Sequence, residues 1–353
     1  DIELWSLTVE DGLTPKSERY NREFLVKKKT NFKEVRPGDI VYNPMNMTLG
    51  AVGFNGMAKS VAVSGYYTTM VANKGYDSYY INTWLKSPQA ISLYKTFATG
   101  SLKEKQRVQF PTLSIIPATF PEHDEQTKIG SYFEHLDHLI TLHQRKCEET
   151  KTLKKYMLQK MFPQNGHSVP EIRFSGFTED WEQRKLSELG QIMTGSTPST
   201  SKSEYYSEDG IPWVTPTDIE ATTILDTPRK LSEEGAKVGR VVPANTILCT
   251  CIASIGKNTL LMVKGSFNQQ INSLTPYEEN DAYFLLTESE LWSNKMKRMA
   301  ASGTMQIVNK TEFSELQTMV PKSAEQKQIG SYFRNLDHLI TLHQRKYMKY
   351  ADL

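Results

Sequence analysis

The chain has 353 residues, of which 38% are hydrophobic, and 42 lysines and arginines nearly balance 40 aspartates and glutamates. This composition is typical of a globular protein, and the length predicts about two domains of roughly 100–200 residues each. No stretch approaches the ~20 apolar residues of a membrane span, and the N-terminal residues lack the features of a signal peptide. Three cysteines without Cys-x-x-Cys spacing argue against disulfides and structural zinc, so we expect a reducing cytoplasm.

Charge is unevenly divided along the chain. Residues 1–120 carry 15 basic and 10 acidic side chains, whereas residues 166–320 carry 14 and 20. A nucleic-acid binder usually has a basic excess, so the acidic second part gives no indication of DNA binding. Composition alone therefore does not predict a DNA-binding protein.

Short β-rich runs and one helical stretch make up the first third of the chain. The runs are Gly38–Tyr42 and Ser60–Val63, and the helical stretch covers Tyr79–Phe97. A long proline-free helix is expected next, from about Glu125 to Met161, which at ~1.5 Å per residue would be ~55 Å long. Matching elements recur later, so the globular parts are of the α+β class. They are strands at Thr246–Thr250 and Thr259–Val263, a helical stretch at Asp281–Met299 and a second long helix.

The organising feature is an internal repeat with an offset of 200 residues. Residues 125–146 and 325–346 are identical at 18 of 22 positions. Fainter landmarks continue upstream in the same order, since Pro37 precedes Gly50 by the same interval that separates Pro243 from Gly256. The chain is therefore a tandem duplication of a unit in which a divergent globular part precedes a nearly identical helix.

Both long helices carry an apolar stripe with alternating steps of four and three residues, the pattern of a coiled-coil seam. Two such seams predict that the helices pair in antiparallel fashion, which gives a pseudo-twofold molecule with a mixed α/β domain near each end of a rod. The alternative is that each helix packs only on its own domain. The seam histidines are expected to meet a polar partner across the pair. The stripe consists of Ile129, Phe133, Leu136, Ile140 and His143 in the first helix and Ile329, Phe333, Leu336, Ile340 and His343 in the second.

The outer face of the two helices is repeated as well. Solvent alone does not require such a match, whereas two copies of one partner would each need the same surface. We therefore expect this face to dock a partner. Its residues are Asp137, His138, Thr141, Gln144 and Arg145 with Asp337, His338, Thr341, Gln344 and Arg345.

Together these features resemble the DNA-specificity (S) subunit of type I restriction-modification systems. The resemblance rests on two divergent domains, each followed by a helix that begins Glu-Gln-x-x-Ile-Gly and contains Leu-Asp-x-Leu-Ile. Further matching phrases are Leu158–Pro163, Asp180–Leu186, Ile255–Gly256 and Asn268–Ile271.

The resemblance implies a non-catalytic, DNA-binding subunit in the bacterial cytoplasm. Two target-recognition domains would each read one half of a bipartite, asymmetric sequence in double-stranded DNA. The helices would set the gap and dock two modification (methyltransferase) subunits, which carry S-adenosylmethionine. Restriction subunits, an ATP-dependent endonuclease and translocase, would complete the complex. No cofactor or metal is expected on this chain itself.

Candidate DNA contacts lie in the divergent loops. Amides, hydroxyls and arginines read base edges, lysines contact phosphates, and glycines allow close backbone approach. The alternative for each position is an ordinary turn residue. The candidates in the first domain are Asn43, Asn46, Tyr66, Tyr67, Lys103, Lys105 and Arg107; those in the second are Thr194, Gly195, Ser196, Thr197, Ser254, Lys257, Asn268 and Gln269.

Catalytic and metal-binding hypotheses are weaker. Asn43–Asn46 begins like the Asn-Pro-Pro-aromatic motif of DNA amino-methyltransferases, but the second proline and the aromatic are absent and no glycine-rich loop precedes it. His138 and His143 are about 140° off a shared helix face, unlike the i, i+4 pair that zinc needs. Cys249 and Cys251 are expected to be one core and one surface residue of a strand. A coiled-coil adaptor and a free-standing methyltransferase stay as alternatives.

The expected boundaries follow the repeat. The first target-recognition domain is expected at residues 1–121, its spacer helix at 122–163, a linker at 164–180, the second domain at 181–321 and the second helix at 322–353. Compared with the second copy, the first domain is expected to lack roughly its opening thirty residues, and the second helix to stop short of a counterpart to Leu158–Pro163.

Overall fold

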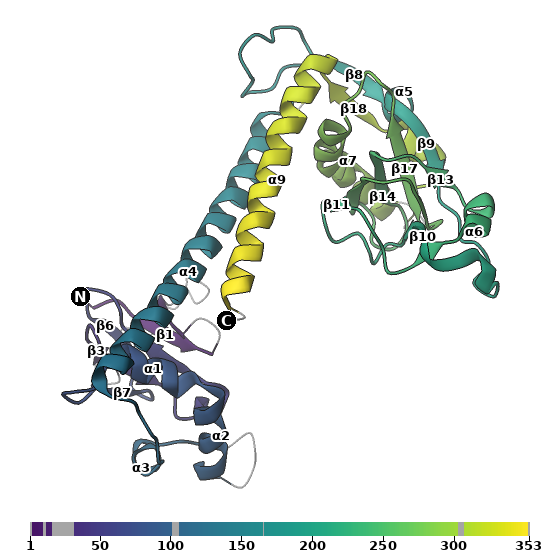
Figure 1. Ribbon diagram of the computed structural model, residues 1–353. Helices are drawn as coiled ribbons and strands as arrows, with labels where there is room; N and C mark the ends of the chain where they lie inside the picture. The colour runs from purple at the N-terminus through teal and green to yellow at the C-terminus, as the bar shows by residue number, and fades with distance from the viewer. Residues whose placement is uncertain are drawn as a thin grey trace. The chain divides into compact units, whose positions relative to one another are not determined.

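The computed structural model describes residues 2–9, 12–15, 32–100, 106–164, 166–302 and 307–351 (Figure 1). The chain forms two compact units, residues 1–142 with 350–353 and residues 143–349. The boundary between them falls inside the long helix α4 (His123–Lys160). Within the described ranges, no helix is both long and apolar enough to cross a membrane.

Short antiparallel strands form the globular part of the first unit. β1 pairs with β2, β3 pairs with β6, and β4 lies between β5 and β7. Val61 and Val63 on β6 are fully buried while Ala62 and Ser64 are not, which is the alternation of a strand with one covered face. The elements are β1 (Trp5–Thr8), β2 (Gly12–Pro15), β3 (Phe32–Val35), β4 (Ile40–Tyr42), the 3-10 turn η2 (Met47–Leu49), β5 (Val52–Phe54), β6 (Val61–Ser64) and β7 (Thr68–Met70).

Two helices cover the β5-β4-β7 sheet where the sequence predicted one. They are α1 (Ser78–Lys86) and α2 (Pro88–Phe97), and α3 (Phe110–Ser114) follows. The break occurs because Pro88 has no N–H to continue α1, while the Ser87 hydroxyl accepts from Ala90 N (3.2 Å) and caps α2. Leu85 and Tyr94 from these helices pack on Ile40, Tyr42 and Val52 of the sheet.

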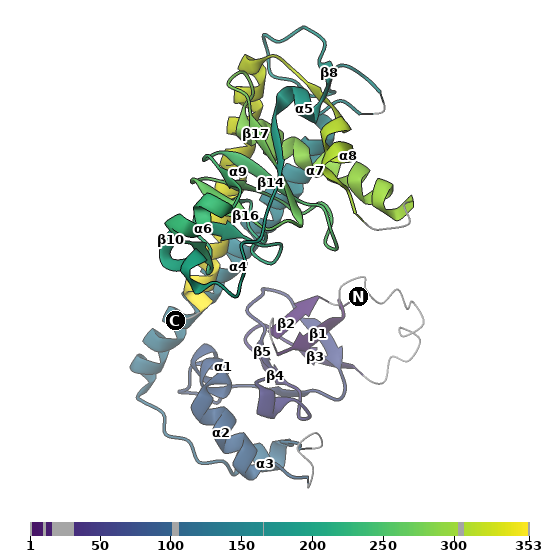
Figure 2. The same ribbon diagram turned by 90° about the vertical axis from the view of Figure 1, so that its right-hand side faces the viewer.

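The second unit is larger and mixes parallel and antiparallel pairing. Its main sheets have the strand orders β11-β15-β14-β17-β9 and β12-β10-β16-β13, and β18 pairs with β8. β10 and α6 lie at one end of this unit and β8 and α5 at the other (Figure 2). The elements are β8 (Glu182–Lys185), α5 (Leu186–Leu189), β9 (Gly190–Thr194), η4 (Ser203–Tyr205), β10 (Tyr206–Val214), β11 (Thr223–Ile224), β12 (Lys230–Leu231), α6 (Glu233–Val238), β13 (Val241–Val242), β14 (Thr246–Thr250), β15 (Asn258–Leu261), β16 (Gly265–Phe267), β17 (Ile271–Pro276), α7 (Ala282–Ser302), α8 (Lys310–Glu315), β18 (Gln317–Val320) and α9 (Ser323–Ala351).

The duplication is present in the strand pairing. β4 lies between β5 and β7, as β14 lies between β15 and β17, and both arrangements are antiparallel. The pair β3–β6 likewise matches β13–β16. Both units therefore mix helices and sheets, as expected, and share a strand order although their sequences diverge.

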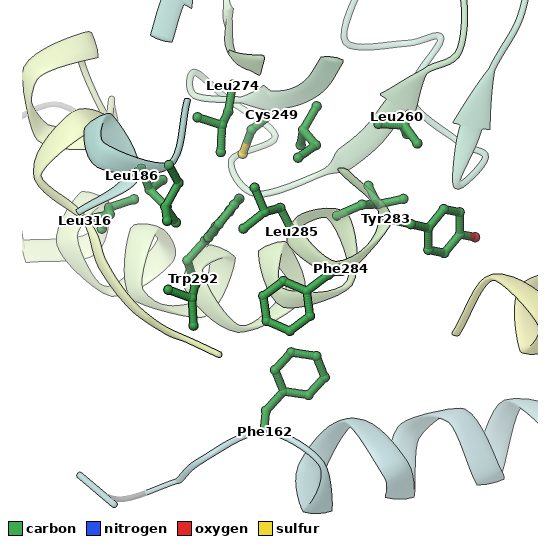
Figure 3. Close-up of a cluster of buried hydrophobic side chains, with 14 of the residues drawn as sticks. Phe162, Leu186, Cys249, Leu260, Leu274, Tyr283, Phe284, Leu285, Trp292 and Leu316 are labelled. Carbon is green, nitrogen blue, oxygen red and sulfur yellow. The ribbon is translucent and has the colours of Figure 1, made fainter. Parts of the chain in front are cut away.

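The core of the second unit includes the C-terminal end of α4 and the N-terminal part of α9. Phe162, just after α4, faces Phe284 on α7 with ring centroids 5.6 Å apart (Figure 3). Phe333 of α9 and Trp181 also contact Phe162, at 5.8 Å each. Burying an aromatic side chain of this kind contributes about 2–3 kcal/mol, so this cluster ties α4 and α9 to the domain.

Within residues 143–349, α9 runs antiparallel to the second half of α4. Ile329, Phe333 and Leu336 lie in the core of the second domain, whereas Ile340 and His343 contact α4 further along. The sequence predicted that the helices pair with each other, with packing on the domain as the alternative. In α9 both occur, in successive turns of the helix. The contacts that run in opposite order are His143 with His343, Cys147 with Ile340, Lys154 with Asp337 and Phe162 with Phe333.

The expectation for the two strand cysteines is wrong. Cys249 and Cys251 are both buried, at 0% and 3% exposure. Residues two apart on a strand point to the same face, so both thiols face the core, where Cys249 Sγ lies 3.6 Å from Met296 Sδ.

Candidate nucleic-acid interface

Six of the eight candidates in the second domain meet in one place. Thr194–Thr197 leave the end of β9, and Asn268 and Gln269 leave the end of β16. The Thr197 hydroxyl donates to the Gln269 side-chain oxygen, and Asn268 Nδ2 donates to Thr197 Oγ1 (3.3 Å). Thr197 and Gln269 are exposed. We call Thr194–Thr197, Asn268 and Gln269 the amide–hydroxyl patch.

Gly195 holds the two strands of the patch together. Its N–H donates to Ile271 O (3.0 Å), and the next N–H, of Ser196, donates to Phe267 O (2.9 Å). A Cβ at Gly195 would lie 2.2 Å from Asn268 O, closer than any real contact. Only glycine therefore allows the β9 loop to approach β16 and bring the threonine and amide side chains together.

An arginine that the sequence did not single out completes the patch. Arg240 donates from Nη1 to Thr194 O (2.6 Å) and from its backbone N–H to Ser196 Oγ (2.9 Å). A second cation, Arg229, lies 5.8 Å from the ring centroid of Trp213, whose Nε1 donates to Ser196 O (3.1 Å). Arg240 is 44 residues from its partner Ser196, so its position depends on tertiary structure and no local motif marks it.

Ser254 and Lys257 lie in a different place, the loop between β14 and β15. Lys257 N donates to Thr250 Oγ1 (3.0 Å), and Gly256 turns the loop with φ +80° against Ser293 of α7. Lys257 is exposed and opens onto a groove of about 1010 Å³. Basic side chains of this groove are Lys151, Lys154, Lys155, Lys257 and Lys297, and its acidic ones are Glu220, Glu290 and Asp337.

In the first domain the structure brings Arg107 beside the Asn43–Asn46 turn. Val108 N donates to Pro44 O (2.9 Å), and in the second domain Val308 N donates to Cys251 O (3.0 Å) in the matching position. Asn46 and Arg107 are exposed and Asn43 is half-buried.

The other candidates of the first domain lie elsewhere or are not described. Tyr66 is 84% exposed in the turn between β6 and β7, and Tyr67 beside it is half-buried. Lys33 Nζ donates to Tyr67 O (2.7 Å) and steadies this turn. Lys103 and Lys105 lie outside the described residues.

The two aspartates of the expected docking face bond to tyrosines of the globular domains. Asp137 Oδ2 accepts from the Tyr79 hydroxyl (2.6 Å), and Asp337 Oδ2 accepts from the Tyr283 hydroxyl (2.8 Å). Asp337 Oδ1 also pairs with Lys154 Nζ (2.8 Å). The presence of aspartate at this position in both copies is thus explained by a hydrogen bond within the chain. The exposed members of this face are Asp137, His138, Thr141, Gln144, Arg145, His338, Thr341 and Arg345, and Asp337 and Gln344 are half-buried.

The seam histidines meet each other across the helix pair. His143 Nδ1 and His343 Nδ1 are 2.9 Å apart. Among the residues described, no group of three or more His, Cys, Asp or Glu side chains is placed to hold a metal ion.

Residues 178–349 match the family model of the type I restriction modification DNA specificity domain. Over 147 residues the chain is 33% identical to the type I restriction enzyme HindI specificity subunit of Haemophilus influenzae, covering 40% of this chain and 32% of that one. Over 169 residues it is 28% identical to the MjaIX specificity subunit of Methanocaldococcus jannaschii, covering 46% and 39%. The chain therefore spans less than half the length of these relatives.

The fold is similar to that of a solved S subunit of a type I restriction-modification system from M. genitalium. The TM-score is 0.67 at 12% identity, with 99% of this chain and 86% of that chain covered. A structure from a study of type I restriction-modification assembly gives a TM-score of 0.51 at 15% identity, covering 92% and 81%. Residues 178–349 are thus similar to a type I DNA specificity domain. The resemblance to type I specificity subunits, predicted from the repeat, is confirmed.

Proposed function

We propose that this chain is the DNA-reading specificity subunit of a type I restriction-modification complex. The observation that carries the proposal is the match of residues 178–349 to a type I DNA specificity domain. The β5-β4-β7 sheet of the first unit repeats the β15-β14-β17 arrangement of that domain, and a nearly identical helix follows each. Each domain reads one half of a bipartite target in double-stranded DNA, and because the two domains diverge, the two half-sites differ.

The amide–hydroxyl patch is the base-reading surface of the second domain. Asn268 and Gln269 carry amides of the kind that bond adenine in the major groove, and Arg240 carries the group that bonds guanine. Lys257 and Lys297 line the separate groove beside α7 and contact phosphates. In the first domain Asn43, Asn46 and Arg107 take the equivalent roles.

The long helices form an antiparallel coiled coil that separates the two pseudo-twofold-related domains and sets the gap between half-sites. Half-sites about 34 Å apart, one turn of B-DNA, suit a spacer of this length. Their repeated exposed face docks two modification subunits, which bring S-adenosylmethionine, and restriction subunits complete the complex. This chain supplies no catalytic group. It binds DNA in the cytoplasm.

A coiled-coil adaptor that reads no DNA is the second candidate. It would explain the helices and the repeated face. The match of residues 178–349 to a DNA specificity domain disfavours it. A free-standing methyltransferase is disfavoured by the incomplete Asn43–Asn46 motif, and methyl transfer by the purified chain alone would revive it.

Long-read methylation mapping tests the proposal. DNA is sequenced from cells that express this chain with its modification subunit, and from cells in which the chain is omitted. We expect one asymmetric motif, two short half-sites with a fixed gap, that depends on the chain. An assembled complex that leaves no such motif would favour the adaptor.

A second experiment tests the docking face. Arg145→Glu with Arg345→Glu reverses one exposed charge in each copy and should weaken co-purification of the modification subunit. Lys264→Glu, in the exposed turn between β15 and β16, is the matched control. Equal recovery with both variants would place docking elsewhere.

A further inference from the structure

One network of hydrogen bonds holds α1 on α4 in the first unit. Asp77 caps α1 by accepting from the backbone N–H of Tyr80 (2.7 Å), and Asp77 N donates to Gln126 Oε1 on α4 (3.2 Å). The hydroxyl of Tyr79 donates to Asp137 Oδ2, about three turns further along α4 (2.6 Å). Gly130 lies between these contacts, and a Cβ there would lie 2.4 Å from Asp77 Oδ1.

The second unit repeats this network with the same residue types. Asp281 caps α7 by accepting from Phe284 N (2.8 Å), and Asp281 N donates to Gln326 Oε1 on α9 (3.0 Å). The Tyr283 hydroxyl donates to Asp337 Oδ2 (2.8 Å), and a Cβ at Gly330 would lie 2.2 Å from Asp281 Oδ1. We call the two networks the helix clamps.

The clamps are alike although their surroundings differ. α1 ends after nine residues at Lys86, whereas α7 continues for 21 residues. Arg334 lies 4.9 Å from the Tyr283 ring, where the first copy has Glu134. Lys154 adds a bond to Asp337. The five clamp residues are therefore the part of each domain–helix contact that stays the same in both copies.

The bonds of a clamp fix an angle as well as a distance. A tyrosine hydroxyl bonded to a carboxylate is directional and stronger than a neutral pair. Burial and the nearby aspartate raise the pKa of both tyrosines, so each hydroxyl stays a donor. In each clamp the domain is bonded to its helix at two separate points. These are Gln126 and Asp137 on α4, and Gln326 and Asp337 on α9. Two points together prevent the domain from rotating about a single contact.

We propose that the helix clamps fix the angle at which each domain meets DNA, and that Tyr79 and Tyr283 are thereby positioning residues that determine which gap is accepted. This inference rests on the proposed function. One added base pair moves a half-site by about 3.4 Å and turns it by roughly 34°, so a complex rejects a wrong gap only if its domains cannot tilt. The length of the spacer sets the gap, and the clamps cause DNA with a longer or shorter gap to be rejected.

The test uses the complex with modification subunits and three DNA duplexes. All carry the mapped half-sites, with the native gap, one base pair fewer or one base pair more, and initial methylation rates are measured. For Tyr79→Phe with Tyr283→Phe we expect the preference for the native gap to fall at least fivefold, while the rate on the native gap falls less than twofold. Tyr132→Phe, an exposed tyrosine of α4, is the matched control and should behave as the unchanged protein. An unchanged preference, or equal loss on all three duplexes, would overturn the inference.

A measurement without DNA separates this inference from the proposed function. Spin labels at Leu225→Cys and Met348→Cys, both exposed in the second unit, report the distance between domain and α9. The native cysteines are buried and do not compete for label. Tyr283→Phe should broaden the distance distribution, and an unchanged width would overturn the clamp. Broadening in a protein that leaves no bipartite motif would instead count against the proposed function.

Discussion

Nδ1 of His143 on α4 lies 2.9 Å from Nδ1 of His343 on α9. A hydrogen bond between two ring nitrogens needs one donor and one acceptor, so at least one imidazole must be neutral. Burial, together with Lys146 and Lys346 nearby, lowers the pKa of both histidines. The helix pair therefore favours the neutral rings, and its stability depends on pH.

Acid should loosen this helix pair. The folded pKa of each ring is below the unfolded value of 6.5, so the unfolded chain binds more protons as the pH falls through 6.5, and the free energy of unfolding falls. Melting temperatures at pH 8 and pH 5.5 measure the effect. His143→Leu with His343→Leu should reduce the difference between them. The same drop with and without the histidines would contradict the assignment.

Glu288 should destabilise the second domain at high pH. It is fully buried on α7, the Thr318 hydroxyl donates to its Oε1, and burial raises its pKa to about 8. Because the folded pKa is above the ordinary glutamate value of 4.5, stability is lost as the pH rises from 4.5 to about 8. Glu288→Gln should remove this loss and raise the unfolding free energy at pH 8 by about 2–4 kcal/mol.

Denaturant titrations at pH 5 and pH 8 check the Glu288 prediction. Glu278→Gln, an exposed residue after β17, is the control and should leave the pH dependence unchanged. If Glu288→Gln behaves like Glu278→Gln, the buried carboxyl does not govern the pH dependence.

The ion pair between Arg173 and Glu325 should stabilise the fold more than Glu125, the residue that matches Glu325 in the first copy. Arg173 Nε and Nη2 each donate to a carboxylate oxygen of Glu325 at 2.7 Å, and Glu325 is 2% exposed. Glu125, at the matching position of α4, is exposed. Glu325→Ala leaves a half-buried guanidinium unpaired and should cost about 3–5 kcal/mol, whereas Glu125→Ala should cost under about 1 kcal/mol. Urea unfolding followed by fluorescence measures both, and equal costs would contradict the prediction.

Base and phosphate contacts of the second domain should separate by mutation. Gln269→Ala should relax discrimination at one position of one half-site by about 1–3 kcal/mol. Lys257→Ala should weaken binding to all sequences alike and reduce its salt dependence. Binding of the assembled complex to duplexes with single substitutions, at two salt concentrations, checks both. A uniform loss with Gln269→Ala would remove this residue from base reading.

Local periodicity predicted the helices well. The proline-free stretch with steps of four and three gave an expected helix of Glu125–Met161, and α4 covers His123–Lys160. The break between α1 and α2 was also encoded locally, by Ser87 and Pro88, but the shared apolar pattern hid it. The seam residues Ile329 and Phe333 were expected to face the other helix. They pack in the domain core as well, because α7 covers the same stripe.

The site was less accessible to sequence reasoning. Thr197 and Gln269 could be proposed from residue type, but their hydrogen bond spans 72 residues and depends on the order of β9 and β16 in their sheets. Arg240 carries no local signal at all. The repeated Asp137 and Asp337 were assigned to docking because a repeat shows that a residue is needed, without showing for which contact.

Gly130 and Gly330 have a consequence for how the chain acquires its structure. Each lies in the interior of a long helix, where glycine costs about 1 kcal/mol relative to alanine. Each spacer helix is therefore less stable in isolation than a helix without the glycine, and each gains stability from the domain that packs against the glycine. Since each domain precedes its helix in the chain, synthesis delivers the supporting surface first, and the ribosome releases each spacer onto a partner that has already begun to fold.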